Sequence, residues 1–78
     1  MAVSAYVLIE VAPEKTKAAL QAVCKINGVK SAHAVTGPYD IIAFCEAKDL
    51  KGCGELVISK IRAISGVTRT LTCVAIEI

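Results

Sequence analysis

Hydrophobic and polar positions divide the chain into four strand-like and two helix-like segments. Residues 2–11 and 41–45 are apolar at both sets of alternating positions, which is typical of strands covered on both faces. Residues 29–35 and 67–78 also have strand character, and the last of these runs to the chain end. The pattern therefore predicts four strands, with the first and third in the middle of a sheet.

The two segments between the strands have the spacing of amphipathic helices. The first, residues 13–26, starts at Pro13, whose missing N–H is not needed at a first helical position. The second, residues 50–64, follows Asp49, which is a good N-cap. In the first helix the stripe expected to be buried contains Ala19, Leu20, Val23 and Ile26. In the second helix it contains Leu50, Gly54, Val57, Ile61 and Ile64.

The order βαββαβ is accompanied by an internal repeat. The motif I-x-G-V occurs at residues 26–29 and again at residues 64–67, so that Gly28 and Gly66 hold equivalent positions. Two such halves with right-handed crossovers form a ferredoxin-like sandwich. We therefore predict one α+β domain over residues 1–78, with a four-stranded antiparallel sheet and two helices on one of its faces.

The second face of this sheet has no helix to cover it. It would carry Tyr6 and Leu8 or their alternates, with further apolar residues from the third and fourth strands. Leaving several hundred Å² of such surface in water would forgo on the order of 10 kcal/mol, at about 25 cal/mol per Å². We therefore predict that two chains dimerise through this face.

Composition supports a partner chain and excludes several classes of protein. Of the 78 residues, 55% are hydrophobic and 21% are charged, which is more apolar material than a small monomer easily hides. The net charge of +2 is spread along the chain, so direct nucleic-acid binding is not expected. No apolar run is long enough to span a membrane, and no signal peptide is apparent. We expect a soluble, cytoplasmic protein.

The four cysteines do not have the spacing of a metal site. Cys24, Cys45, Cys53 and Cys73 include no C-x-x-C pair. We expect all four to be reduced, buried and hydrophobic in character.

No catalytic constellation is apparent either. His33 is the single histidine, and a lone histidine in a strand is more often packed or interfacial than a general base. The serines occupy no nucleophile elbow, and no glycine-rich phosphate loop is present. We expect a non-catalytic protein without a cofactor.

The segment from Thr36 to Asp40 is the best candidate binding site. Gly37 and Pro38 predict a tight type I or II turn between two strands, and Gly37 can let another molecule approach the backbone closely. Asp40 could pair with an ammonium group, while N–H groups near Gly37 could bind a carboxylate. Alternation also predicts one row of hydroxyls on the last strand, from Thr68, Thr70 and Thr72. A threonine-rich strand can equally reflect β propensity alone.

These segments carry a resemblance to a known family. The matching motifs are A-x-V-L-I-E-V at residues 5–11, V-T-G-x-Y-D at residues 35–40 and I-x-G-V-x-x-T-x-T at residues 64–72. The chain resembles, end to end, the effector-binding (RAM) domain of the Lrp/AsnC (feast/famine) transcriptional regulators. The resemblance implies dimers that assemble into rings, often octamers, and an amino-acid effector bound between dimers. It implies ligand-binding roles for Gly37, Tyr39, Asp40, Thr70 and Thr72.

Two features depart from that family. Full regulators carry an N-terminal helix-turn-helix domain, whereas this chain begins on its first strand, which suggests a stand-alone module that could join a related DNA-binding regulator. Pro38 stands where the family often has a polar or charged residue, so effector choice could differ.

Three other interpretations remain open on the sequence. The first is a small enzyme of the dimeric α+β-barrel type, with His33 as its only candidate base. The second is a purely structural assembly subunit. The third is an ACT-type amino-acid-binding domain, which is disfavoured because residues 12–13 offer no glycine after the first strand.

Overall fold

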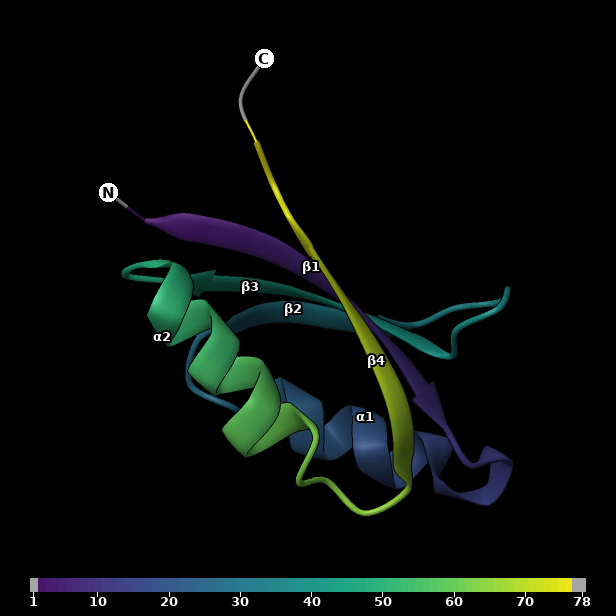
Figure 1. The fold of residues 1–78 in the computed structure, drawn as a ribbon. Coiled ribbons are helices and arrows are strands. Elements are labelled where there is room, and N and C mark those ends of the chain that lie inside the picture. Colours follow the sequence, from purple (N-terminus) through teal and green to yellow (C-terminus); the bar gives the residue numbers. More distant parts are fainter. Residues whose placement is uncertain (1, 77–78) are drawn as a thin grey trace.

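The computed structural model describes residues 2–76 and has the predicted architecture (Figure 1). Strand β1 (Val3–Val11) leads through a short 3-10 turn (Pro13–Lys15) into helix α1 (Thr16–Cys24). Strands β2 (Val29–Ala34) and β3 (Ile41–Ala47) form a hairpin. Helix α2 (Leu50–Glu55) continues as a π-helical segment (Leu56–Ile61), and strand β4 (Val67–Val74) follows. Strand β4 ends at Val74, so the prediction of a strand to the chain end is wrong for residues 75–76, while residues 77–78 lie outside the described residues.

The four strands form one antiparallel sheet in the order β2-β3-β1-β4. The two most apolar strands are therefore central, as the sequence predicts. Both helices cover the same face, where odd-numbered residues of β1 and β3 point inward. The core contains Val7, Ile9, Val11, Ile41, Ala43 and Cys45 from the sheet and Ala19, Val23, Leu56, Val57 and Ile61 from the helical layer.

The two I-x-G-V motifs adopt matching backbone conformations. Gly28 has φ +106° and Gly66 has φ +96°, which are positive values that favour glycine. Each glycine ends the turn that follows a helix and leads directly into a strand. The repeat in the sequence is therefore a repeat of this turn.

The second helix differs from its prediction in three respects, the first being that it ends at Ile61 rather than at residue 64. Its second half is π-helical, with the Arg62 N–H donating to the Val57 carbonyl at 3.0 Å. Leu50, predicted to be buried, is 63% exposed because it lies at the first helical residue, where no other element covers it. Cys53 and Leu56 are buried in its place. The predicted cap is correct: Asp49 accepts the Gly52 N–H at 2.7 Å.

The face of the sheet opposite the helices is apolar and uncovered within the chain. Cross-strand pairing places Tyr6 beside Phe44 and Cys73, and Leu8 beside Ile42 and Leu71. The rings of Tyr6 and Phe44 lie 5.0 Å apart between centroids. Tyr6 is 48% exposed and Leu71 is 47% exposed. We call this surface the open face.

No helix within residues 2–76 is long and apolar enough to cross a membrane.

Candidate functional site

The connection between β2 and β3 is a wide loop. The prediction of a tight type I or II turn is wrong here: residues 36–40 form successive bends, closed by the Val35 N–H donating to the Asp40 carbonyl at 2.9 Å. Pro38 lies among these bends. The loop therefore presents several backbone groups at one end of the sheet.

Asp40 fixes this loop to the central strand. Its N–H donates to the Ile9 carbonyl at 2.9 Å, and its Oδ2 accepts the Val11 N–H at 2.8 Å. The pairing of β1 with β3 ends at Ile9 and Ile41, so Val11 lies beyond the last pair of that ladder and the carboxylate supplies the acceptor for its N–H. Sequence reasoning assigned Asp40 to a ligand and missed this structural bond. The other carboxylate oxygen of Asp40, Oδ1, has no hydrogen-bond partner within residues 2–76.

Gly37 and Tyr39 differ in their exposure. Gly37 is exposed at φ +131°, and nothing lies within 4 Å of the position that a Cβ would occupy. The positive φ favours glycine at this position, and the space beside the backbone is open. Tyr39 is half-buried at the other end of the loop. The loop therefore combines an open backbone position with an anchored carboxylate.

The predicted row of threonine hydroxyls on β4 is broken. Thr70 and Thr72 pair with Ile9 and Val7, so they lie on the helix-covered side of this edge strand. Because of the register shift, Thr68 has no partner in the β1–β4 ladder and does not continue the row. Its hydroxyl lies 3.1 Å from the Glu10 carbonyl oxygen and 3.0 Å from the Glu10 Oε1, and can donate to either. A bulge interrupts the alternation of side chains, and this is why simple alternation failed.

Within one chain these threonines do not converge on the loop. Thr70 lies at the same end of the sheet as Asp40, but β1 stands between their strands. Two strand spacings separate them, or about 10 Å. Thr72 lies one pair farther along. A site that contains both the loop and these threonines would need a second chain.

The cysteines fall into two classes, and the prediction that all four are buried is wrong for two of them. Cys45 and Cys53 are buried between sheet and helix, whereas Cys24 and Cys73 are exposed. Cys24 is the last residue of α1, and Cys73 lies on the open face beside Tyr6. Residues 2–76 contain no cluster of three His, Cys, Asp or Glu side chains that could hold a metal ion.

Burial makes the Cys45 thiol resistant to ionisation, and this predicts a pH-dependent stability. Loss of hydration, with a smaller effect from Cys53, raises the Cys45 pKa from its ordinary 9.0 to about 11. Unfolding releases the thiol to ionise near its ordinary pKa. This contribution to stability is therefore complete below pH 9 and is lost as the pH rises through 11, by at most about 3 kcal/mol in total.

A Cys45→Ala protein tests this pH dependence. It should be less stable than the parent at pH 7, with a difference in unfolding free energy that narrows between pH 9 and 11. Urea titrations across that range measure both proteins under the same conditions. A constant difference would show that the thiol does not titrate as described.

His33 is not part of any catalytic arrangement in the described residues. It is exposed on the edge strand β2, where its partner across the sheet is Ile42 of the open face. The imidazole therefore lies beside the uncovered apolar face rather than in the core between sheet and helices.

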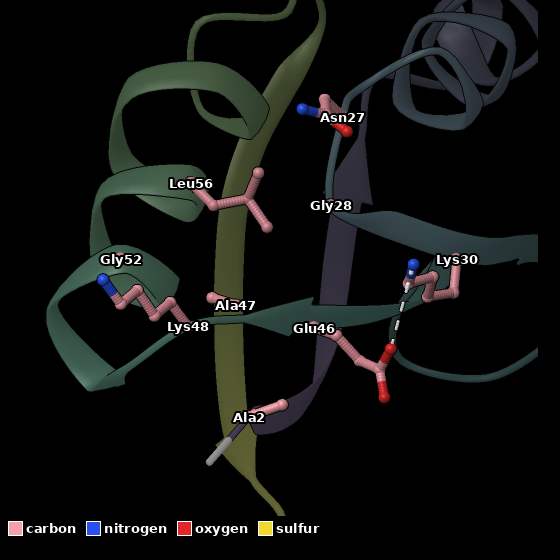
Figure 2. A pocket seen from close by; sticks show the side chains of 9 residues that line it. All are labelled: Ala2, Asn27, Gly28, Lys30, Glu46, Ala47, Lys48, Gly52 and Leu56. Carbon is pink, nitrogen blue, oxygen red and sulfur yellow. Dashed lines mark ion pairs between the residues drawn. The ribbon is translucent and has the colours of Figure 1, made fainter.

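A cavity, shown in Figure 2, lies where β2 begins and β3 ends, at the opposite end of the hairpin from the loop. It is an open groove of about 430 Å³ between the start of α2, the turn before β2 and the end of β3. Sequence reasoning missed it, although Gly28 and Gly52 with Lys30 and Lys48 were available as signals. The lining residues are Ala2, Asn27, Gly28, Lys30, Glu46, Ala47, Lys48, Gly52 and Leu56.

Comparison with known proteins gives consistent results. The family model of the Lrp/AsnC ligand binding domain matches residues 4–78. An uncharacterized HTH-type transcriptional regulator from Pyrococcus furiosus is 36% identical over 75 residues, which are 92% of this chain and 50% of the relative. The chain thus spans about half the length of the curated regulators that it matches. TTHA0845 from Thermus thermophilus superposes with a TM-score of 0.93 at 32% identity, over 97% of this chain and 95% of the other.

Two further similarities concern larger proteins. A homocitrate synthase from Sulfurisphaera tokodaii is 37% identical over 62 residues, which are 80% of this chain but 13% of the enzyme. A Neisseria meningitidis regulator solved with L-Met has a TM-score of 0.79 at 18% identity, over 96% of this chain and 50% of the regulator, and shows likeness of fold. Fold, motifs and family model agree, and the chain belongs to the Lrp/AsnC ligand-binding-domain family.

Proposed function

We propose that this chain is an amino-acid-sensing regulatory module that acts as an oligomer. The observation that carries the proposal is the loop at residues 36–40, where an open glycine backbone lies beside a carboxylate held in place by β1. A zwitterion needs both kinds of group: N–H donors for its carboxylate and an anion for its ammonium. The family description and the L-Met complex of a structural relative support a ligand of this class.

The proposed oligomer begins with a dimer through the open face. A half-exposed tyrosine and leucine flank Leu8, Ile42 and Phe44 on a surface that no helix of the chain covers. Contiguous apolar surface of this kind is typical of contacts between chains. Dimers would then associate further, into a ring such as an octamer.

The proposed ligand lies between dimers. Gly37, Tyr39 and Asp40 would contribute from one chain, and the free Oδ1 of Asp40 would bind the ammonium group. Thr70 and Thr72 would contribute their hydroxyls from another chain, because they do not reach the loop of their own chain. Ligand binding would in this way stabilise one arrangement of dimers over others.

Two classes of downstream partner fit the comparisons. The first is a related DNA-binding regulator, since the curated relatives named as HTH-type regulators contain this domain as half of their length. The second is an enzyme, since a homocitrate synthase contains a similar segment. Co-purification of the chain with each class of partner, with and without amino acid, distinguishes them.

Replacing Asp40 separates its two roles. Asp40→Asn keeps an oxygen that can accept the Val11 N–H but removes the charge. We expect this protein to lose most of the rise in melting temperature that an amino acid causes, while its own stability falls by less than about 1 kcal/mol. Asp40→Ala removes the acceptor as well, and we expect it to be destabilised by about 2 kcal/mol.

Differential scanning fluorimetry of the parent chain with each of the twenty amino acids is the primary measurement. If none of them shifts the melting temperature, the sensing proposal is wrong. If an amino acid raises the melting temperature of the parent and of Asp40→Asn equally, the carboxylate does not bind the ammonium group. The role of Asp40 is then only to accept the Val11 N–H of β1.

A further inference from the structure

One side of the second helix, α2 with its π-helical continuation, carries large apolar residues that no other element covers. Leu50 and Ile58 are each 63% exposed, although the buried side of the same helix, with Cys53 and Ile61, packs into the core. Gly54 lies between the two exposed residues, four positions from each. In Figure 1 this helix lies at the periphery of the fold.

Leu50, Gly54 and Ile58 follow one line along the helix. Steps of four residues drift around an α-helix of 3.6 residues per turn, by about 40° each. The second half of the helix is π-helical, and its wider turn keeps Ile58 in line with Gly54. Leu56, two residues before Ile58, is buried on the opposite side, beside the turn that precedes β2. We call this line of three residues the α2 stripe.

Gly54 makes the α2 stripe shallow at its middle. No atom lies within 4 Å of the position that a Cβ of Gly54 would occupy, so packing inside the chain does not require a glycine here. Glycine also makes a helix less stable than alanine does. Its advantage is that the backbone of another helix can approach closely. Leu50 and Ile58 would then lie on either side of the point where the two helices cross.

The charges beside the α2 stripe are complementary to a second copy of the same helix. Lys51 and Glu55 lie on the solvent side of the stripe, one helical turn apart, and neither has an ion-pair partner within residues 2–76. Two antiparallel copies related by a two-fold axis at Gly54 bring Lys51 of each copy within about 3 Å, along the helix axis, of the partner's Glu55. The same arrangement places Leu50 of each copy against the partner's Ile58.

We propose that the α2 stripe is a second contact surface, which binds the α2 stripe of another copy of this chain in an antiparallel arrangement. This inference rests on the proposed function in one respect: the open face forms the dimers that the α2 stripe then joins to one another. The helical layer and the open face lie on opposite sides of the sheet, so both contacts can form at once. Two different two-fold contacts on one chain build an assembly larger than a dimer. The α2 stripe is short, so its contact is the weaker of the two.

The test is sedimentation velocity of the full chain from micromolar to millimolar concentration. We expect the parent to change from dimers to larger assemblies as its concentration rises. Ile58→Asp should weaken this second step by at least about a hundredfold and leave dimers, because it buries an unpaired charge between two helices. Gly54→Gln should block the second step too, since its side chain has open space in one chain but fills the crossing point of two. Its melting temperature as a dimer should rise above that of the parent, which shows that the variant is folded.

Charge exchange tests the antiparallel arrangement. Lys51→Glu and Glu55→Lys should each weaken the second step by about tenfold, because each places like charges together across the two-fold axis. The protein with both changes should recover the association of the parent. Lys60→Glu is the matched control, since Lys60 lies four residues after Leu56, on the side away from the α2 stripe. It makes the same change of charge as Lys51→Glu and should leave association unchanged.

Leu71→Asp separates this inference from the proposed function. Leu71 belongs to the open face, so this variant removes the contact that forms the dimer and leaves the α2 stripe intact. We expect pairs of such chains at millimolar concentration, and Ile58→Asp in the same chain should abolish them. Failure of the open-face dimer therefore does not decide the result for the α2 stripe.

Three outcomes would overturn the proposal. The first is a Leu71→Asp protein that stays a single chain up to millimolar concentration. The second is a set of larger assemblies that persists unchanged in Ile58→Asp and Gly54→Gln. The third is a double charge exchange that fails to restore association, which would show that the copies do not meet in an antiparallel arrangement at Gly54.

Discussion

A Gly66→Ala protein is expected to be about 3 kcal/mol less stable than the parent chain, which is a large share of the stability of a small domain. Gly66 has φ +96°, which an alanine adopts only with strain. Its new Cβ would also lie 2.5 Å from the Lys15 Cβ and 2.8 Å from the Lys15 Cγ. The Ala12 N–H donates to the Gly66 carbonyl at 2.9 Å, so the turn cannot move away without breaking that bond. Urea denaturation measures the loss.

Gly28→Ala is the matched control that the internal repeat provides. Its φ of +106° imposes a similar backbone strain, but its nearest neighbour is the Leu56 Cδ1 at 3.2 Å, the far end of a flexible side chain. We therefore expect a loss of about 1 kcal/mol, mainly from strain. Equal losses for the two proteins would show that contact with Lys15 adds nothing and that conformation alone fixes both glycines.

These two glycines show what the sequence can and cannot predict. The repeat of I-x-G-V predicts two equivalent turns, and the positive φ values confirm them. Whether a neighbour approaches such a turn depends on residues that are far away in the sequence. Lys15 approaches Gly66 across 51 residues, and no local pattern indicates that contact.

Strand order and helix placement were predictable because the spacing of apolar residues within each segment determines which of its faces is buried in the fold. The most apolar strands must be central, and one buried stripe on each helix must face the sheet. Local irregularities escaped prediction for the opposite reason. The bulge at Glu10 and the π-helical turn at Leu56–Ile61 each add a residue to the regular repeat of a strand or a helix. The same amino-acid sequence is also compatible with a regular strand or helix, so it does not predict either irregularity.

The loop at residues 36–40 was predictable as a connection between two strands, but the hydrogen bond that Asp40 makes there was not. Glycine, proline, tyrosine and aspartate between two strands predict a loop, and loops are common positions for binding residues. The sequence does not reveal that Asp40 already binds the Val11 N–H, because this bond joins two residues that lie 29 positions apart in the chain. The groove is harder still, since its lining comes from four separate elements and emerges only when the chain folds.

A Leu71→Asp protein should sediment as a single chain at concentrations where the parent sediments as a dimer. Leu71 lies on the open face beside Leu8 and is 47% exposed in the single chain, so the substitution costs the fold little. In the proposed dimer each chain would bury one unpaired carboxylate against apolar side chains. Burial of an unpaired charge costs several kcal/mol, which weakens dimerisation by about three orders of magnitude.

Ile58→Asp is the control for this experiment. Ile58 is also a large exposed hydrophobic residue, at 63%, but it lies on the helical layer, on the other side of the sheet. The same change of charge there should leave the dimer intact. Analytical ultracentrifugation with circular dichroism on all three proteins separates loss of association from loss of folding. If the parent chain is folded but monomeric, the proposed amino-acid site has no second chain. The proposal would then fail, because β1 separates Thr70 and Thr72 from the loop of their own chain.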